Sequence, residues 1–229
     1  MRFQEVDNID DLISLVENIG FLPFFTNRIP GFSLEEIISP ECWYQGLEGG
    51  RIDWPAWDWK GEVVQRRSLI YGKLYERKAG FVSPEWMPHL CNYRRGGYDF
   101  DARYEDGMAQ RKDKLLMEYL QMSGPTLSRD MKRDLDYRKG GSTGFDTVVT
   151  RLQMQTYIVP VNYEYARSKD GEEYGFGVAR YGTTEEYWGD DICTSEYGAE
   201  PEESFERIVQ HLTSVLPDID EAEIRRLMK

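Results

Sequence analysis

The sequence predicts an α+β fold that is predominantly helical and contains a winged helix-turn-helix with a β-hairpin wing. The prediction comes from the stretch between Gly124 and Gly189, where two short helical patterns precede an alternating strand, a charged turn and a second alternating strand. The turn contains Asp170-Gly171, a dipeptide typical of tight hairpins. The order of these patterns, together with that turn, is the basis of the fold class.

Residues 1–107 form a helical, aromatic-rich N-terminal region in this interpretation. Apolar residues at helical spacing predict an amphipathic helix over 8–19. A second helix is expected over 61–79, with its valine, leucine and isoleucine side chains inside and its basic side chains outside. Ser83 as an N-cap and Pro84 in the first turn predict that a further short helix begins there.

Residues 108–190 form the predicted winged-helix region. Its first helix covers 108–122, its second has the sequence SRDMKRDL, and its third begins at Phe145 after a glycine-rich link. Strands over 157–165 and 174–181 form the wing, because their apolar and aromatic residues alternate along the chain. The remaining residues, 191–229, are expected to be an acidic helical tail packed on the core.

Positive charge is concentrated in the middle of an acidic chain. The net charge is −13, yet residues 51–152 carry +4 while 1–50 carry −7 and 153–229 carry −10. Acidic ends can simply keep a protein soluble. If a polyanion is bound, the middle segment is the part that contacts it. The predicted nucleic-acid contacts are Arg66, Arg67, Lys132, Arg133 and, on the outer face of the third helix, Thr147, Thr150 and Arg151.

Composition excludes several other classes of protein. No apolar run approaches the roughly 20 residues of a membrane span, and the acidic N-terminus does not resemble a signal peptide, so a cytoplasmic location is expected. Three widely spaced cysteines indicate free thiols. With only two histidines, no metal-ligand spacing is present, so neither a metal site nor a cofactor is expected.

Four of the six tryptophans lie between residues 43 and 59, and Trp54, Trp57 and Trp59 alternate with acidic residues. Such rings can form a platform on which a base or another planar ligand stacks. They can equally fix the packing of a small domain, since each ring buries a large area. The acidic neighbours Asp53 and Asp58 favour packing, because they would repel a phosphate backbone.

Two carboxylates after a Gly-Gly pair are the weak catalytic candidates. In Tyr98-Asp99-Phe100-Asp101, strand-like alternation would place Asp99 and Asp101 on one face. Either could act as a general base, or could stabilise a sugar cation. The alternative is a structural network of ion pairs, because arginines are interspersed with these acids.

The runs GPTLSRDM, GFDTVVTRLQMQTYIV and YGFGVARYGTTEEYW resemble the winged helix of the AlkZ/YcaQ-type bacterial DNA glycosylases. Upstream, KLYERKAGFVSPEWMPHLCNYRR is similar to the segment of that family in which an aromatic-rich helix leads into a proline-containing helix start. The similarity covers roughly residues 61–190, and within that family the chain resembles a short AlkZ-related group. It implies a DNA-related protein whose family excises alkylated bases, with double-stranded DNA as the expected partner.

The family's catalytic motif is not found at its expected place. The family has Gln-x-Gln or Gln-x-Asp just after the first helix, whereas this chain has Gly20-Phe21-Leu22-Pro23-Phe24 there. A Gln-Met-Gln occurs at Gln153 and Gln155, but residues two apart on a helix point in nearly opposite directions. No catalytic residue is therefore carried over from the resemblance.

Three functions remain open from the sequence. The first is a DNA-binding protein related to the glycosylases, without demonstrated catalysis. The second is an active base-excision glycosylase that uses an unrecognised carboxylate. The third is a protein with no nucleic-acid role, in which the winged helix forms a packing or partner surface.

Overall fold

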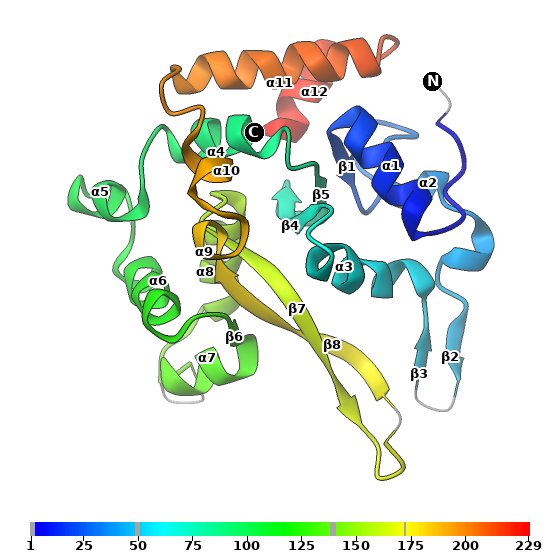
Figure 1. The fold of residues 1–229 in the computed structure, drawn as a ribbon, viewed down its shortest axis with the longest axis horizontal. Helices are drawn as coiled ribbons and strands as arrows, with labels where there is room; N and C mark the ends of the chain where they lie inside the picture. The colour runs from blue at the N-terminus through cyan, green and yellow to red at the C-terminus, as the bar shows by residue number, and fades with distance from the viewer. Residues whose placement is uncertain (1–2, 49–50, 138–140, 172) are drawn as a thin grey trace.

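A computed structural model describes residues 3–48, 51–137, 141–171 and 173–229. Helices make up 49% and strands 20% of it, and the strands form small antiparallel sheets. The fold is therefore a mixed α/β fold with more helix than strand (Figure 1). No helix in these ranges has the length and apolar character needed to cross a membrane.

The first 65 residues form a series of short helices and strands. Asn8 caps the first helix by accepting hydrogen bonds from the backbone of Asp10 and Asp11, and Gly20, at φ +78°, ends it. The elements in order are α1 (Ile9–Ile19), β1 (Phe21–Pro23), α2 (Leu34–Ile37), the 3-10 helix η1 (Pro40–Cys42), β2 (Gly46–Glu48), β3 (Arg51–Asp53) and α3 (Pro55–Gln65).

The predicted helix over 61–79 is wrong. Helix α3 ends at Gln65, and a β-hairpin follows, made of β4 (Ile70–Tyr75) and β5 (Lys78–Val82). Most of β4 is buried on both faces, so its sequence lacks the alternation that identifies a half-exposed strand. Residues of the turn, Glu76 and Arg77, take positive φ values of 46° and 67°. With β1, the hairpin forms a sheet in the order β1-β5-β4.

Helix α4 (Met87–Arg95) and two helices from the C-terminal end of the chain form a layer beside this sheet. Helix α4 packs against α11 (Pro201–Val215), with the rings of Tyr93 and Phe205 stacked at 4.3 Å between centroids. Helix α12 (Glu221–Met228) completes this layer (Figure 1). The Arg94 guanidinium donates hydrogen bonds to the carbonyl oxygens of three separate elements, those of Leu74, Met154 and Met228.

The central part contains the predicted helices and wing strands. Its elements are α5 (Phe100–Glu105), α6 (Arg111–Ser123), β6 (Thr126–Leu127), α7 (Ser128–Asp134), α8 (Phe145–Met154), β7 (Ile158–Arg167) and β8 (Glu173–Thr183). The three strands form an antiparallel sheet in the order β6-β8-β7. Two short helices follow, α9 (Thr184–Trp188) and α10 (Asp190–Thr194).

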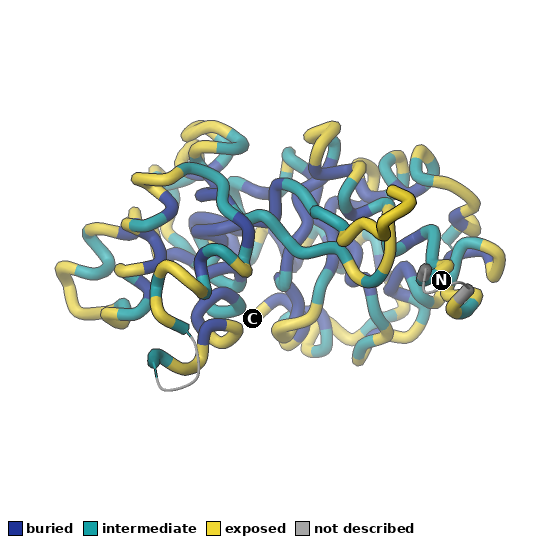
Figure 2. Tube along the Cα trace, turned by 90° about the horizontal axis from the view of Figure 1, so that it is seen from below, coloured by how far each residue is buried: buried dark blue, intermediate teal, exposed yellow. Residues whose placement is uncertain are grey.

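Buried hydrophobic residues form two clusters. The smaller one joins α6, α7 and α8 through residues such as Leu116, Met131 and Leu152, and it takes in Phe100 of α5. The larger one contains the β1-β5-β4 sheet, α1, α3 and the C-terminal helices. Buried segments lie in the interior of both halves of the molecule, and exposed ones at its periphery (Figure 2).

The β7–β8 hairpin lies against α3. The Gln65 amide donates to the side-chain oxygen of Asn162 at 2.6 Å, and the Tyr165 hydroxyl donates to Asp58 at 2.6 Å. The hairpin extends past α3 towards the β2–β3 hairpin (Figure 1). One side of the predicted wing is thereby held by the N-terminal part of the chain.

Candidate functional site

A cavity of about 340 Å³ lies where the two hydrophobic clusters meet. Its walls come from α3, the β4–β5 hairpin, α8, β7 and β8. We call it the cation-lined cavity, because four basic side chains line it: Lys60, Lys73, Arg77 and Lys78. Of the residues that the structure describes, no aspartate or glutamate is among its lining residues.

Lys60 is the deepest of the four cations, with 1% of its surface exposed. Its ammonium group lies 3.9 Å from the centre of the Trp57 ring and 4.6 Å from that of Tyr163, and it donates a hydrogen bond to the Trp57 carbonyl. Burial lowers the pKa of Lys60 to about 7, while the neighbouring Asp58 acts in the opposite direction. Near neutral pH this amine is therefore close to half protonated.

The other three cations lie nearer the opening of the cavity. Lys73 is half-buried and donates to the Thr150 hydroxyl at 3.2 Å, whereas Arg77 and Lys78 are exposed. Lys78 donates to the carbonyl of Thr26 at 3.2 Å. None of these three forms an ion pair within the described ranges, so their charges face the cavity and solvent. Positive charge thus increases from the floor of the cavity to its rim.

Aromatic rings form most of the remaining wall. They belong to Phe25, Trp57, Tyr71, Tyr163 and Tyr181. Burial raises the pKa of Tyr181 to about 12, and it raises that of Tyr71 and Tyr163 further still. The three phenols are therefore neutral at physiological pH and can act as hydrogen-bond donors.

The tryptophan cluster belongs in part to this wall. Trp54 and Trp57 stack at 4.9 Å between ring centroids with 24° between their planes, and both pack around the buried Phe24. Their indole N–H groups are buried and have no hydrogen-bond partner in the described part of the chain. The cluster therefore packs the N-terminal core, and Trp57 also lines the cavity.

The two glutamines of Gln-Met-Gln lie in different surroundings. Gln153 is 2% exposed, lines the cation-lined cavity and accepts a hydrogen bond from the backbone N–H of Lys73 at 3.0 Å. Gln155 follows the end of α8, and its side-chain oxygen is buried with no hydrogen-bond partner among the described residues. The pair does not share one surface.

The residues predicted to contact nucleic acid are spread over three elements, and most already contact carboxylates. Arg66 pairs with Asp10 and Glu62, Lys132 with Asp146, and Arg133 with Asp130 and Asp134. Arg67 lies over the Tyr187 ring, 4.6 Å from its centre. Thr147 is exposed on α8, beside the 81%-exposed side chain of Asp146.

Arg151 differs from these surface pairs. Its guanidinium donates from Nε to both oxygens of Asp113, at 3.1 and 3.0 Å, and the Asp113 side chain is 2% exposed. Asp113 also accepts from the backbone N–H of Gln110, which caps α6. Arg151 therefore fixes α8 against the start of α6.

The catalytic candidates Asp99 and Asp101 line a second cavity, of about 490 Å³, together with Glu185 and Glu186. The predicted strand over 98–101 is wrong, because Asp99 caps α5 and accepts from the backbone N–H of Ala102 at 2.8 Å. Asp101 lies in the first turn of that helix. Helix geometry prevails here because a capped turn satisfies backbone donors that a lone strand would leave unpaired.

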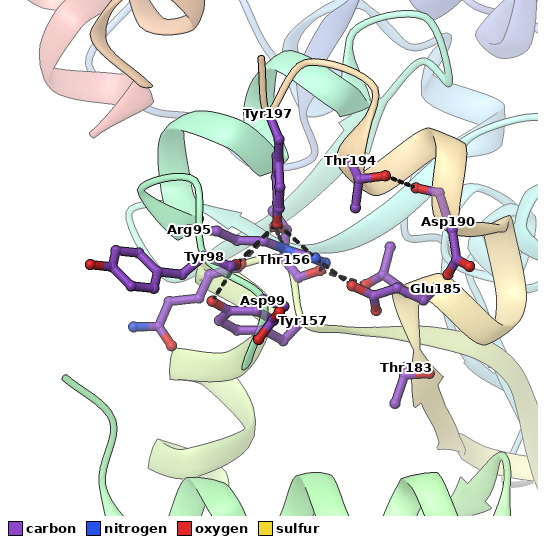
Figure 3. Close-up of polar contacts among 12 residues, drawn as sticks. Arg95, Tyr98, Asp99, Thr156, Tyr157, Thr183, Glu185, Asp190, Thr194 and Tyr197 are labelled. Atoms are coloured by element: carbon purple, nitrogen blue, oxygen red, sulfur yellow. Dashed lines mark hydrogen bonds and ion pairs between the residues drawn. The ribbon is translucent and has the colours of Figure 1, made fainter. Parts of the chain in front are cut away.

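A buried arginine pairs with Glu185, one of the residues that line this second cavity. Arg95 has an inaccessible side chain that pairs with Glu185, donates to the Thr156 carbonyl at 2.7 Å and reaches the Tyr197 hydroxyl at 3.3 Å (Figure 3). Tyr98 accepts hydrogen bonds at its backbone carbonyl from Tyr157 and Tyr197. The network links α4 to α9 and to the segment between α8 and β7, and the charge of Arg95 is compensated by that of Glu185.

Within the described ranges, no three His, Cys, Asp or Glu side chains lie close enough together to hold a metal ion. All three cysteines are free thiols.

Sequence reasoning missed Lys60, Lys73, Arg77 and Lys78 as a group. The helix predicted over 61–79 placed three of them on a solvent-exposed face, whereas the observed hairpin brings them over α3. The available signal was the two-residue spacing of Tyr71 and Lys73, because a strand places side chains at that spacing on one face.

Among models of known protein families, one described as AlkZ related matches residues 6–229. The matched range includes the first helix, the β4–β5 and β7–β8 hairpins and the C-terminal helices. No curated protein and no solved structure matched the chain.

Proposed function

We propose that this chain, which belongs to the AlkZ-related family, binds double-stranded DNA through a winged helix formed by residues 108–190. The observation that carries the proposal is the order α6-β6-α7-α8-β7-β8 with the sheet order β6-β8-β7. Three helices followed by a hairpin that pairs with a short strand between the first two is the arrangement expected of a winged helix. Family membership adds the relation to DNA glycosylases.

In this arrangement α8 occupies the position of the helix that enters the major groove. Thr147 is exposed on this helix, whereas Thr150 is half-buried and accepts a hydrogen bond from Lys73. Both can supply hydroxyl groups to phosphates or base edges. Lys132 and Arg133 of α7 lie beside it, since Lys132 pairs with Asp146 of α8. We propose these four residues, with Arg66 and Arg67 near the end of α3, as the contacts to DNA.

The ion pairs of these residues decide which of them can reach a phosphate. Exposed ion pairs contribute only about 0–1 kcal/mol, so Lys132 and Arg133 can exchange a carboxylate for a phosphate at little cost. The pair between Arg151 and the buried Asp113 costs several kcal/mol to break, about 3–5 by comparison with other buried pairs. Arg151 therefore positions α8 and does not itself contact DNA in this proposal.

Fluorescence anisotropy with a labelled duplex at several salt concentrations tests the proposal. We expect binding at low salt that weakens as salt rises, and removing one phosphate-binding side chain should reduce the logarithmic salt slope by about 0.9. The double variant Lys132→Ala, Arg133→Ala should reduce it by about twice that. Arg207→Ala, on α11, is the matched control for removal of an exposed arginine. Absence of duplex binding at low salt would instead support a protein-partner role for this surface.

Base excision is the second candidate function. It is favoured by the position of Asp99 and Asp101 on the wall of a cavity large enough for a nucleobase. Release of alkylated base from treated duplex DNA is the assay. Activity that is unchanged in the Asp99→Asn, Asp101→Asn variant would exclude these two carboxylates as catalytic groups.

A further inference from the structure

The cation-lined cavity has features that duplex binding through α8 leaves unexplained. It combines a buried lysine, three further cations and five aromatic rings, in a chain whose net charge is −13. A buried cation without a carboxylate partner is costly unless another group compensates it. Such an arrangement is typical of a site whose counter-charge is supplied by a ligand.

The sizes and positions of the lining groups restrict the ligand. A volume of about 340 Å³ lies at the lower end of the range of small-molecule sites, about 300–1,000 Å³. The rings of Trp57, Tyr163 and Tyr181 favour a flat, apolar body inside the cavity. Arg77 and Lys78 at the exposed rim favour a negatively charged group at the opening.

Polar groups among the lining residues can form hydrogen bonds with the edge of a planar ligand. Lys60 offers ammonium hydrogens, and the Gln153 amide lies on the same wall and is bonded to Lys73. The Tyr181 hydroxyl contributes a further neutral polar group. A ring system with carbonyl and ring-nitrogen acceptors could accept the ammonium hydrogens of Lys60 that the Trp57 carbonyl does not use, whereas a purely apolar ring could not.

We propose that the cation-lined cavity binds a single nucleotide unit, with its base among the aromatic rings and its phosphate on Arg77, Lys78 and Lys73. The unit can be a free mononucleotide or one unstacked nucleotide of a single strand, because both present the same base and phosphate. The proposal goes beyond duplex binding through α8, and it stands or falls independently of it.

The negative charge and the acceptor atoms of a nucleotide in the cavity stabilise the protonated amine of Lys60, so occupancy takes up a proton. The charged and titratable groups around Lys60 are Asp58 on its own helix, Tyr163 on β7, and Lys73, Arg77 and Lys78 on the β4–β5 hairpin. All but Asp58 are cationic or neutral near pH 7. An incoming phosphate would be the largest added negative charge at the site.

Isothermal titration calorimetry with the four deoxynucleoside monophosphates tests the proposal. At least one of them should bind more tightly than its nucleoside and more tightly than inorganic phosphate, because neither fragment contacts both the rings and the rim. Arg77→Ala should weaken nucleotide binding roughly ten-fold or more, the usual effect of losing a hydrogen bond to a charged group. Lys169→Ala, at the exposed turn between β7 and β8, is the matched control and should leave the affinity unchanged.

Competition separates the two sources of the nucleotide. If an unlabelled single-stranded oligonucleotide displaces the mononucleotide, and Arg77→Ala weakens both, the cavity takes a nucleotide of a strand. If the oligonucleotide does not displace it, the cavity takes free nucleotides. The proposal is overturned if no mononucleotide and no oligonucleotide binds, or if Arg77→Ala and Lys60→Met, both checked as folded by circular dichroism, bind as the parent does.

The variants also keep this proposal separate from duplex binding. Lys132→Ala, Arg133→Ala should lose duplex affinity and keep nucleotide affinity, because neither residue lines the cavity. Arg77→Ala should lose nucleotide affinity and keep duplex affinity. A failure of one assay with success in the other therefore identifies which proposal is wrong.

Discussion

The outer surface around α8 and the cation-lined cavity hold similar numbers of basic side chains in opposite electrostatic settings. Around α8, Lys132, Arg133 and Arg151 each face a carboxylate. In the cavity, the cations face aromatic rings, carbonyl oxygens and a hydroxyl. A count of basic residues along the sequence therefore says little about where a bound anion would find uncompensated charge.

We expect the largest effect on stability when the ion pair between Arg151 and the buried Asp113 is broken. Arg151→Met leaves the carboxylate of Asp113, which is 2% exposed, without its charged partner, and should lower the free energy of unfolding by about 3 kcal/mol. Urea denaturation measures it. Lys132→Met, which removes one member of an exposed pair, should cost less than about 1 kcal/mol. Equal losses of unfolding free energy in the two variants would mean that the Arg151 pair stabilises the fold no more than an exposed pair does.

A smaller effect of opposite sign is expected in the cavity. Lys60→Met replaces a buried charge with an apolar side chain of similar length and should raise the free energy of unfolding by about 2 kcal/mol at neutral pH.

The pKa of Lys60 is about 7 in the folded chain and 10.5 as its ordinary value, so the unfolded chain binds more protons between these pH values. The contribution of Lys60 to stability therefore increases as pH rises through that window.

The pH dependence of unfolding checks this assignment. The variant Lys60→Met should lack the part of the slope that Lys60 contributes between about pH 7 and about pH 10. Lys73→Met, at the half-buried position on the same wall, is the control and should retain the slope. Identical slopes in the parent and in Lys60→Met would show that Lys60 does not titrate in this window.

The smallest expected effect concerns ligand affinity. If a nucleotide occupies the cavity, its affinity should fall as pH rises from about 6 to about 8, because the pKa of Lys60 near 7 makes the amine neutral over that interval. The expected loss is roughly ten-fold or less, and calorimetry at several pH values measures it. In Lys60→Met the affinity should be lower and nearly independent of pH. An unchanged pH dependence in that variant would assign the proton to another group.

The central part of the fold could be predicted well from the sequence because its signals are local. Helix α6, helix α8 and the β7–β8 hairpin follow from apolar spacing, from strand alternation and from the Asp170-Gly171 turn. The β4–β5 hairpin could not, because β4 is buried on both faces and basic residues after α3 imitate an exposed helical face. Tertiary burial overrode the local pattern there.

The cation-lined cavity could not be predicted from the sequence, because its residues meet only in the tertiary fold. Its cations come from α3 and from the misassigned hairpin, and two of its rings, Tyr163 and Tyr181, come from strands about a hundred residues later. Phe25, Trp57, Tyr163 and Tyr181 share no spacing that a sequence pattern could detect. The predictions for Asp99 and Asp101 named residues that do line a cavity, although their function is untested.

The stacking of Trp54 on Trp57 gives the molecule a built-in optical probe. Two indoles 4.9 Å apart with 24° between their planes couple electronically, and this coupling contributes to the far-ultraviolet circular dichroism spectrum. Trp57 also forms part of the cavity wall, so its emission responds to whatever enters. Occupancy can therefore be followed in the unlabelled protein by light alone, with Trp57→Phe supplying the blank.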